Sequence, residues 1–125
     1  MTVHSFNFLI LERDNLVARD MSEGFAAISR DSRFKHFKNT SQILEYIEKK
    51  GNDLENPVVV TKLPIAEIDA TGLTNATEGI GSRVVVRMES NAPEEVSARG
   101  WYGLAAPFSS DDLADLVREL LTRVA

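Results

Sequence analysis

The chain has no cysteine, and its lysines and histidines are confined to the first half. The absence of cysteine excludes disulfides, thiol nucleophiles and thiolate metal ligands across all 125 residues. No lysine or histidine follows Lys62. With 14 Lys and Arg against 19 Asp and Glu, the formal net charge is −5, which argues against binding to nucleic acid. No stretch approaches the roughly 18 consecutive apolar residues of a membrane-spanning helix, which argues against insertion into a membrane.

The composition is that of one ordinary globular domain. Hydrophobic residues make up 43% of the chain, charged residues make up 26%, and there are four prolines. A chain of this length can bury a sizeable core but is short for two ordinary domains, so we expect one domain over residues 1–125. Its start lacks the basic residues and the unbroken apolar run of a secretory signal. We therefore expect a cytoplasmic protein.

Short apolar strands alternate with amphipathic helices along the chain. Runs of β-branched and other apolar residues predict strands, and apolar residues at helical spacing with polar caps predict helices. The expected strands are residues 6–11, 34–38, 58–61, 83–88 and 104–106. The expected helices are residues 15–29, 41–50, 70–78, 93–98 and 109–125. This alternation predicts an α/β domain with a parallel sheet that is covered by helices on both faces.

Two segments resemble the receiver domain of two-component response regulators. Residues 8–17, FLILERDNLV, are similar to that family's first strand, acidic loop and helix start. Residues 106–113, APFSSDDL, are similar to its Lys-Pro-Phe segment and final helix. The order and separation of the two segments also agree with the family, and the likeness spans essentially the whole chain. The resemblance implies the doubly wound, flavodoxin-like fold of the chemotaxis receivers, with sheet order 2-1-3-4-5.

The resemblance also indicates which functional residues of a receiver are replaced in this chain. Receivers hold Mg²⁺ with an acidic pair after the first strand, and they accept a phosphoryl group on an aspartate that ends the third strand. A Ser or Thr after the fourth strand and a Lys after the fifth then contact the phosphoryl group. The corresponding positions here are Glu12 and Arg13, with Asp14 beside them, then Thr61, then Met88 or Glu89, and finally Ala106.

These replacements imply a receiver-like domain that is not phosphorylated. A guanidinium group does not ligate a cation, and no aspartate lies between Asp53 and Asp69 to accept a phosphoryl group. We expect no metal, no cofactor and no catalytic residue. Two interpretations of Arg13 are open: it supplies a fixed positive charge in place of the metal, or it faces solvent and pairs with Glu12 or Asp14.

Protein binding is the activity that the resemblance favours. Receivers use the face formed by their fourth helix, fifth strand and fifth helix for dimers and partners. The corresponding surface here includes Arg99, Trp101, Tyr102, Asp115 and Arg118. The two aromatic residues lie between glycines, which slightly favours an exposed loop over a place in the core. We expect a signalling-protein partner, or a homodimer through this face, within a two-component or phosphorelay pathway.

A partner-switching module is the main alternative. Residues 68–73, IDATGL, are similar to the Asp-Ser/Thr-Ser/Thr-Gly-Leu stretch of STAS domains, which antagonise anti-sigma factors. In this chain Ala70 stands where that family has its phosphorylated serine. Because STAS domains begin with paired strands, the strand order of the sheet separates the two resemblances.

An enzyme is less favoured than either binding module. Acid-base catalysis needs a positioned histidine, lysine or pair of carboxylates. The hydroxyl groups of Thr61, Thr71 and Ser90 have no such base nearby in the sequence. His36 lies on an expected edge strand, where a surface role is the commoner one.

Overall fold

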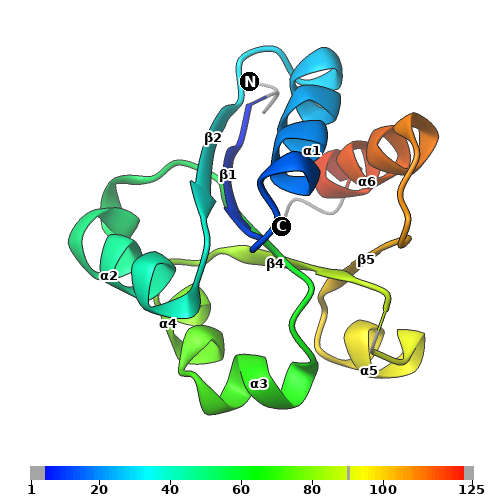
Figure 1. Ribbon diagram of the computed structural model, residues 1–125. Coiled ribbons are helices and arrows are strands. Elements are labelled where there is room, and N and C mark those ends of the chain that lie inside the picture. Colours follow the sequence, from blue (N-terminus) through cyan, green and yellow to red (C-terminus); the bar gives the residue numbers. More distant parts are fainter. Residues whose placement is uncertain (1–4, 90, 123–125) are drawn as a thin grey trace.

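The computed structural model describes residues 5–89 and 91–122 (Figure 1). The strands are β1 (Asn7–Leu11), β2 (Arg33–Phe37), β3 (Pro57–Thr61), β4 (Arg83–Arg87) and β5 (Tyr102–Leu104). The helices are α1 (Asn15–Ile28), α2 (Thr40–Lys50), the short 3₁₀ helix η1 (Gly51–Asp53), α3 (Ile65–Ala70), α4 (Leu73–Gly79), α5 (Pro93–Ala98) and α6 (Ser110–Thr122). Ser90, one of the hydroxyl residues considered above, lies outside the described residues.

The five strands form one parallel sheet in the order β2-β1-β3-β4-β5. Leu11, the last residue of β1, is in register with Phe37 at the end of β2 and with Thr61 at the end of β3. This order confirms the doubly wound α/β fold that the receiver resemblance implies. The STAS alternative is wrong for this chain, because α1 follows β1 and every strand pairing in the sheet is parallel.

Helices cover both faces of the sheet and close a separate hydrophobic core on each. On one face α1 and α6 pack on the sheet around Phe8, which is fully buried and stacks on Phe25 of α1. On the other face α2, α3, α4 and α5 contribute Ile43, Ile68 and further apolar residues to the second core. Figure 1 shows the same division, with α1 and α6 beside each other and α2, α3, α4 and α5 on the other side of the strands. Burial on both faces explains why β3 and β4 contain runs of valine.

Two elements of the structure differ from the expected ones. The helix expected over residues 70–78 is two short helices, because Gly72 adopts a left-handed conformation (φ 87°) that ends α3 and precedes α4. The fifth strand is Tyr102–Leu104 and not residues 104–106. In that strand Tyr102 and Leu104 point inward on either side of exposed Gly103, so the alternation that defines the strand begins two residues earlier than expected.

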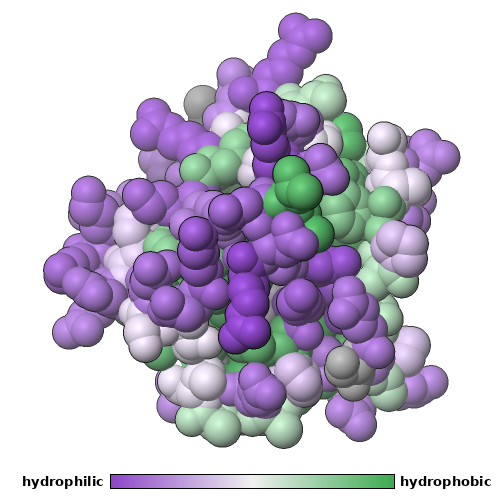
Figure 2. All heavy atoms as spheres, viewed as in Figure 1, coloured by the Kyte–Doolittle hydropathy of each residue, from purple (hydrophilic) through white to green (hydrophobic). Residues whose placement is uncertain are grey.

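The face of the molecule seen in Figure 2 is mainly hydrophilic, with separate small hydrophobic areas. Large exposed hydrophobic side chains include Leu16 and Ile28, at opposite ends of α1. Within residues 5–89 and 91–122, no helix combines the length and the apolar character needed to cross a membrane.

Candidate functional site at the carboxyl edge of the sheet

The parallel strands end at one edge of the sheet, here called the carboxyl edge, and they bring charged residues together there. Glu12 directly follows β1, Lys62 follows β3, and Arg87 ends β4. Ligand sites in doubly wound folds lie at this edge, near the point where the strand order reverses. These residues are far apart in the sequence, and the parallel sheet order makes them neighbours.

Glu12 is buried, and positive groups surround its carboxylate. Its residue exposure is 2%. Oε1 accepts a hydrogen bond from a guanidinium nitrogen of Arg87 at 2.9 Å, and the ammonium of Lys62 lies 3.4 Å from Oε2. Oε2 also accepts the backbone N–H of Asp14 at 2.9 Å. A carboxylate removed from water in this way is stabilised only while these partners remain in place.

Arg87 is the centre of this network. Its side chain is 9% exposed and makes a second ion pair with Glu89 at 3.0 Å. Its guanidinium also lies over the ring of Phe108, 5.7 Å from the ring centroid, and this cation–π contact helps to hold the guanidinium in place. The buried Nε has no hydrogen-bond partner among the described residues. Four charged side chains, Lys62, Glu12, Arg87 and Glu89, therefore form a chain of alternating sign across the ends of β1, β3 and β4.

The Mg²⁺ site that the resemblance implies does not fit these residues. Both carboxylate oxygens of Glu12 already face cationic nitrogens. Asp14 instead caps α1, where its Oδ1 accepts the backbone N–H of Leu16 at 2.8 Å. Within the described residues, no cluster of three or more Asp, Glu, His or Cys side chains could hold a metal ion. The local charge arrangement is that of an ion-pair network and not of an acidic metal pocket.

Arg13 is exposed, and the pairing with Glu12 or Asp14 that one interpretation of the sequence suggested for it is wrong. It faces solvent, but no residue in the described chain forms an ion pair with it, neither Glu12 nor Asp14. The fixed positive charge beside Glu12 comes from Arg87 and Lys62. Arg13 instead lines a surface cavity on the side of α2.

The other expected pocket positions divide into those that face the site and those that do not. Thr61 ends β3, as expected, and is 1% exposed; its Oγ1 accepts the backbone N–H of Leu63 at 3.2 Å. Met88 does not face the network, because its side chain packs beside Gly103 with the second core. Arg87, one residue before Met88, faces the network, and Glu89 pairs with it. Ala106 follows β5, is half-buried and brings no charge to the edge.

Sequence reasoning missed Lys62, Arg87 and Asn91. The side-chain oxygen of Asn91 accepts the backbone N–H of Ile65 at 2.9 Å, and its amide donates to the carbonyl of Leu63 at 3.2 Å. It therefore ties the segment after β4 to the loop between β3 and α3. The signal for Arg87 and Lys62 was available, since each lies where a run of three valines ends and all parallel strands end at one edge.

The residues expected on an interaction surface are in three different environments. Tyr102 is buried at 5% exposure, so the expectation of an exposed aromatic loop is wrong for it. Trp101 is half-buried, and the guanidinium of Arg99 lies 4.9 Å from its ring centroid. Asp115 and Arg118 are exposed on α6 and pair with each other at 3.0 Å.

Arg99 also joins α3 to the segment between α5 and β5. Its two terminal nitrogens donate to the two carboxylate oxygens of Asp69, at 2.6 and 2.5 Å. Thr74 donates a further hydrogen bond to Asp69 at 2.6 Å. The hydrogen bonds from Arg99 and Thr74 lower the pKa of Asp69 from 3.8 to about 2.

This lowered pKa predicts a specific loss of stability in acid. The contribution of Asp69 to stability is complete above its ordinary pKa of 3.8 and is lost as pH falls through about 2. Asp69→Asn should therefore show a shallower fall in urea-unfolding midpoint between pH 5 and 2.5 than the wild-type protein. Asp115→Asn, which removes an exposed pair on α6, is the control and should keep the wild-type slope. Equal slopes for Asp69→Asn and the wild-type protein would contradict this assignment.

Comparison with known proteins relates the chain to others by fold. No protein-family model matches the sequence, and no curated protein matches it either. A pilus assembly-related protein from Burkholderia pseudomallei has a similar structure, with a TM-score of 0.70 at 15% identity over 98% of this chain and 93% of that one. The receiver domain of a Francisella response regulator has a TM-score of 0.66 at 18% identity over 94% of this chain and 98% of its own. The chain has the flavodoxin-like fold of the receiver domains.

Proposed function

We propose that the chain is a receiver-like signalling domain that works without phosphorylation, through contacts with another protein in a two-component-type pathway. The observation that carries the proposal is the buried Glu12–Arg87 ion pair at the carboxyl edge. In a phosphorylated receiver this edge holds Mg²⁺ and an aspartate that accepts the phosphoryl group. Here a guanidinium and an ammonium neutralise the carboxylate, and Thr61 ends β3. The pair acts as an internal substitute for the metal and holds the domain in one state.

The proposed contact surface is the edge of the sheet formed by α5, β5 and α6. β5 is the edge strand next to β4, and α5 and α6 pack beside it. Asp115 and Arg118 are exposed there, while Trp101 contributes the part of its ring that the protein leaves uncovered. A second copy of the chain or another cytoplasmic signalling protein is the proposed partner. Tyr102 supports this surface from beneath, because it is buried.

A magnesium titration followed by amide NMR tests whether this domain has kept the cation site. Millimolar MgCl₂ should give no saturable shifts in residues 12–14 or 61–62, because the oxygens of Glu12 already face Arg87 and Lys62. Sodium chloride at matched ionic strength is the control for general screening. Saturable shifts at these amides with MgCl₂ and not with sodium chloride would overturn the proposal.

A further inference from the structure

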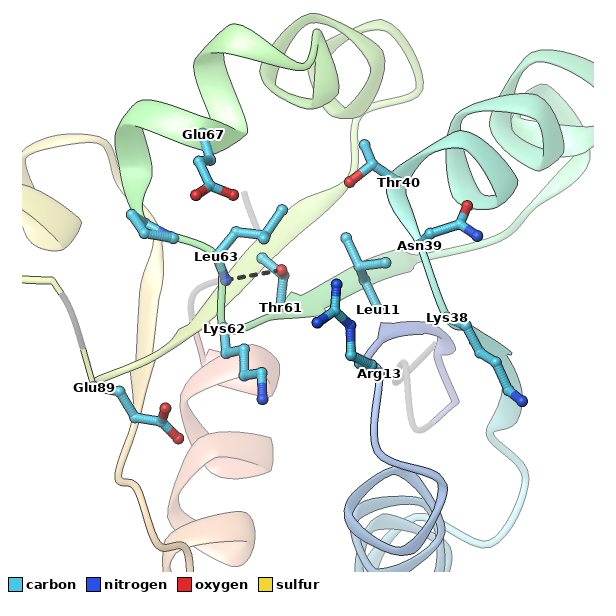
Figure 3. Close-up of a pocket in the computed structure, with 11 residues that line it drawn as sticks. Leu11, Arg13, Lys38, Asn39, Thr40, Thr61, Lys62, Leu63, Glu67 and Glu89 are labelled. Atoms are coloured by element: carbon cyan, nitrogen blue, oxygen red, sulfur yellow. Dashed lines mark hydrogen bonds between the residues drawn. The ribbon is translucent and has the colours of Figure 1, made fainter.

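A cavity of about 450 Å³ opens beside the charged network, between the ends of β1 and β3 and the start of α2 (Figure 3). Buried Leu11 and Thr61 belong to its lining, as do Leu63 and Pro64 from the loop after β3. This cavity lies where doubly wound folds bind ligands.

Arg13 supplies an uncompensated positive charge to this cavity. Figure 3 shows its guanidinium between Thr61 and Leu11, below Thr40 at the start of α2. No carboxylate of the described residues forms an ion pair with it, although acidic residues outnumber basic ones in the chain. A guanidinium offers a planar set of donors that matches the oxygens of a carboxylate or phosphate group.

Other groups around the cavity add to its preference for an anion. α2 begins at the cavity, so the positive end of its dipole lies at the opening. Lys38 lies on the rim, and Figure 3 shows its side chain directed away from the cavity. Thr61 is 1% exposed and belongs to the lining. Its Oγ1 accepts the backbone N–H of Leu63, and the same hydroxyl group also has a hydrogen that it can donate.

The two acidic residues of the lining do not cancel this preference. Glu89 is already paired with Arg87, and Glu67 lies across the cavity from Arg13 on α3 (Figure 3). The ion pairs of Lys62, Glu12, Arg87 and Glu89 balance within their own network. Glu67 is then the one acidic group of the lining outside this network, and it forms no ion pair with Arg13 in the described residues.

The cavity also has an apolar wall. Leu11, Leu63 and Pro64 all belong to its lining, and Figure 3 shows Leu63 on the side of α3 and Leu11 on the side of α2. A bare inorganic ion would leave this wall exposed to water, whereas a compact organic body would cover it.

We propose that this cavity binds a small organic anion, with its carboxylate or phosphate group against Arg13 and its apolar body against Leu11, Leu63 and Pro64. No metal takes part in this binding. The inference goes beyond the proposed signalling function and does not depend on it, because the cavity exists whether or not a partner protein binds the α5–β5–α6 edge.

Amide NMR titrations with benzoate and phenyl phosphate, at fixed ionic strength with a chelator present, test this site. Either probe should give saturable shifts in residues 13, 38–40 and 61–63, and the one that binds more tightly identifies the head group. Arg13→Gln should weaken that binding about tenfold, the loss expected for a charge-assisted hydrogen bond. Arg30→Gln is the matched control: Arg30 is exposed before β2, at the other end of the strands, and its replacement should leave the affinity unchanged.

Three results would overturn the proposal. They are the absence of saturable shifts with both probes, equal affinity of the wild-type protein and Arg13→Gln, and equally tight binding of uncharged benzyl alcohol. Because Arg13 is exposed and has no ion-pair partner among the described residues, Arg13→Gln should fold, and its own amide spectrum verifies this. Failure of the magnesium prediction would leave these results unaffected, so the two proposals are tested separately.

Discussion

Arg87→Met is expected to lower the free energy of unfolding by about 3 kcal/mol, because it leaves the buried carboxylate of Glu12 without its main partner. Glu12 has a side-chain exposure of 1%, so water cannot replace the lost guanidinium. We expect the lower end of the usual range for a broken buried pair, since Lys62 remains 3.4 Å away. Urea unfolding at neutral pH measures the loss.

A double variant separates the loss of a partner from the loss of packing. Glu12→Leu combined with Arg87→Met replaces both charges with apolar groups, and it should recover most of the stability that Arg87→Met loses. Arg118→Met is the matched control, because it removes an exposed arginine from an ion pair on α6 and should cost less than about 1 kcal/mol. If Arg87→Met cost no more than Arg118→Met, the buried network would not have the role assigned to it.

Phe8→Ala is expected to cost about 3–5 kcal/mol, since it removes a fully buried ring from the core under α1 and α6. The ring of Phe8 stacks on Phe25 with centroids 4.3 Å apart and on Phe34 with centroids 5.4 Å apart. One side chain therefore joins β1 to α1 and to β2. Thermal and urea unfolding would both report the change.

Phe34→Ala is the control for Phe8→Ala. Phe34 belongs to the same aromatic stack but is partly exposed on the edge strand β2, so its truncation should cost clearly less. Equal losses for the two variants would contradict the central place of Phe8 in this core.

The parallel sheet could be predicted because the hydrophobic pattern is strong, and its strand order followed from the resemblance to receiver domains. Residues 58–60 and 84–86 are consecutive valines that suit strands buried on both faces, and α1 and α6 have clear polar caps and apolar stripes. Thr61 was expected to end the third strand because it directly follows one of these runs, and it is the last residue of β3. The break between α3 and α4 and the bounds of β5 were not predicted, because each depends on a short local signal. The break depends on Gly72, and β5 depends on the alternation over Tyr102–Leu104.

The ends of the valine runs indicated where Lys62 and Arg87 would lie, but their ion pairs could not be predicted because they join distant parts of the chain. Glu12 and Arg87 are 75 positions apart, and only the parallel order of β1, β3 and β4 makes them partners. In the sequence Arg87 has the pattern of an ordinary charged residue at the surface end of a strand. The resemblance to the acidic loop of receivers made Arg13 one candidate for a charge in place of the metal, and in the structure Arg13 lines the cavity beside α2.

The burial of the residues on the expected interaction surface could not be predicted from the sequence either. A tryptophan and a tyrosine between glycines do not indicate by themselves which ring is buried. In the structure the strand alternation places Tyr102 inward, and Arg99 covers one side of Trp101 while it binds Asp69. The exposed part of this surface is accordingly smaller and more polar than the sequence indicated.

Phosphorylation by a small phosphodonor tests the central claim most directly. The wild-type protein would be incubated with acetyl phosphate and MgCl₂ and analysed by intact-mass spectrometry, with a receiver domain that retains its acceptor aspartate as the positive control. We predict no gain in mass for this chain, because Thr61 ends β3 and Arg87 and Lys62 neutralise Glu12. A magnesium-dependent gain of one phosphoryl group per chain would contradict the account.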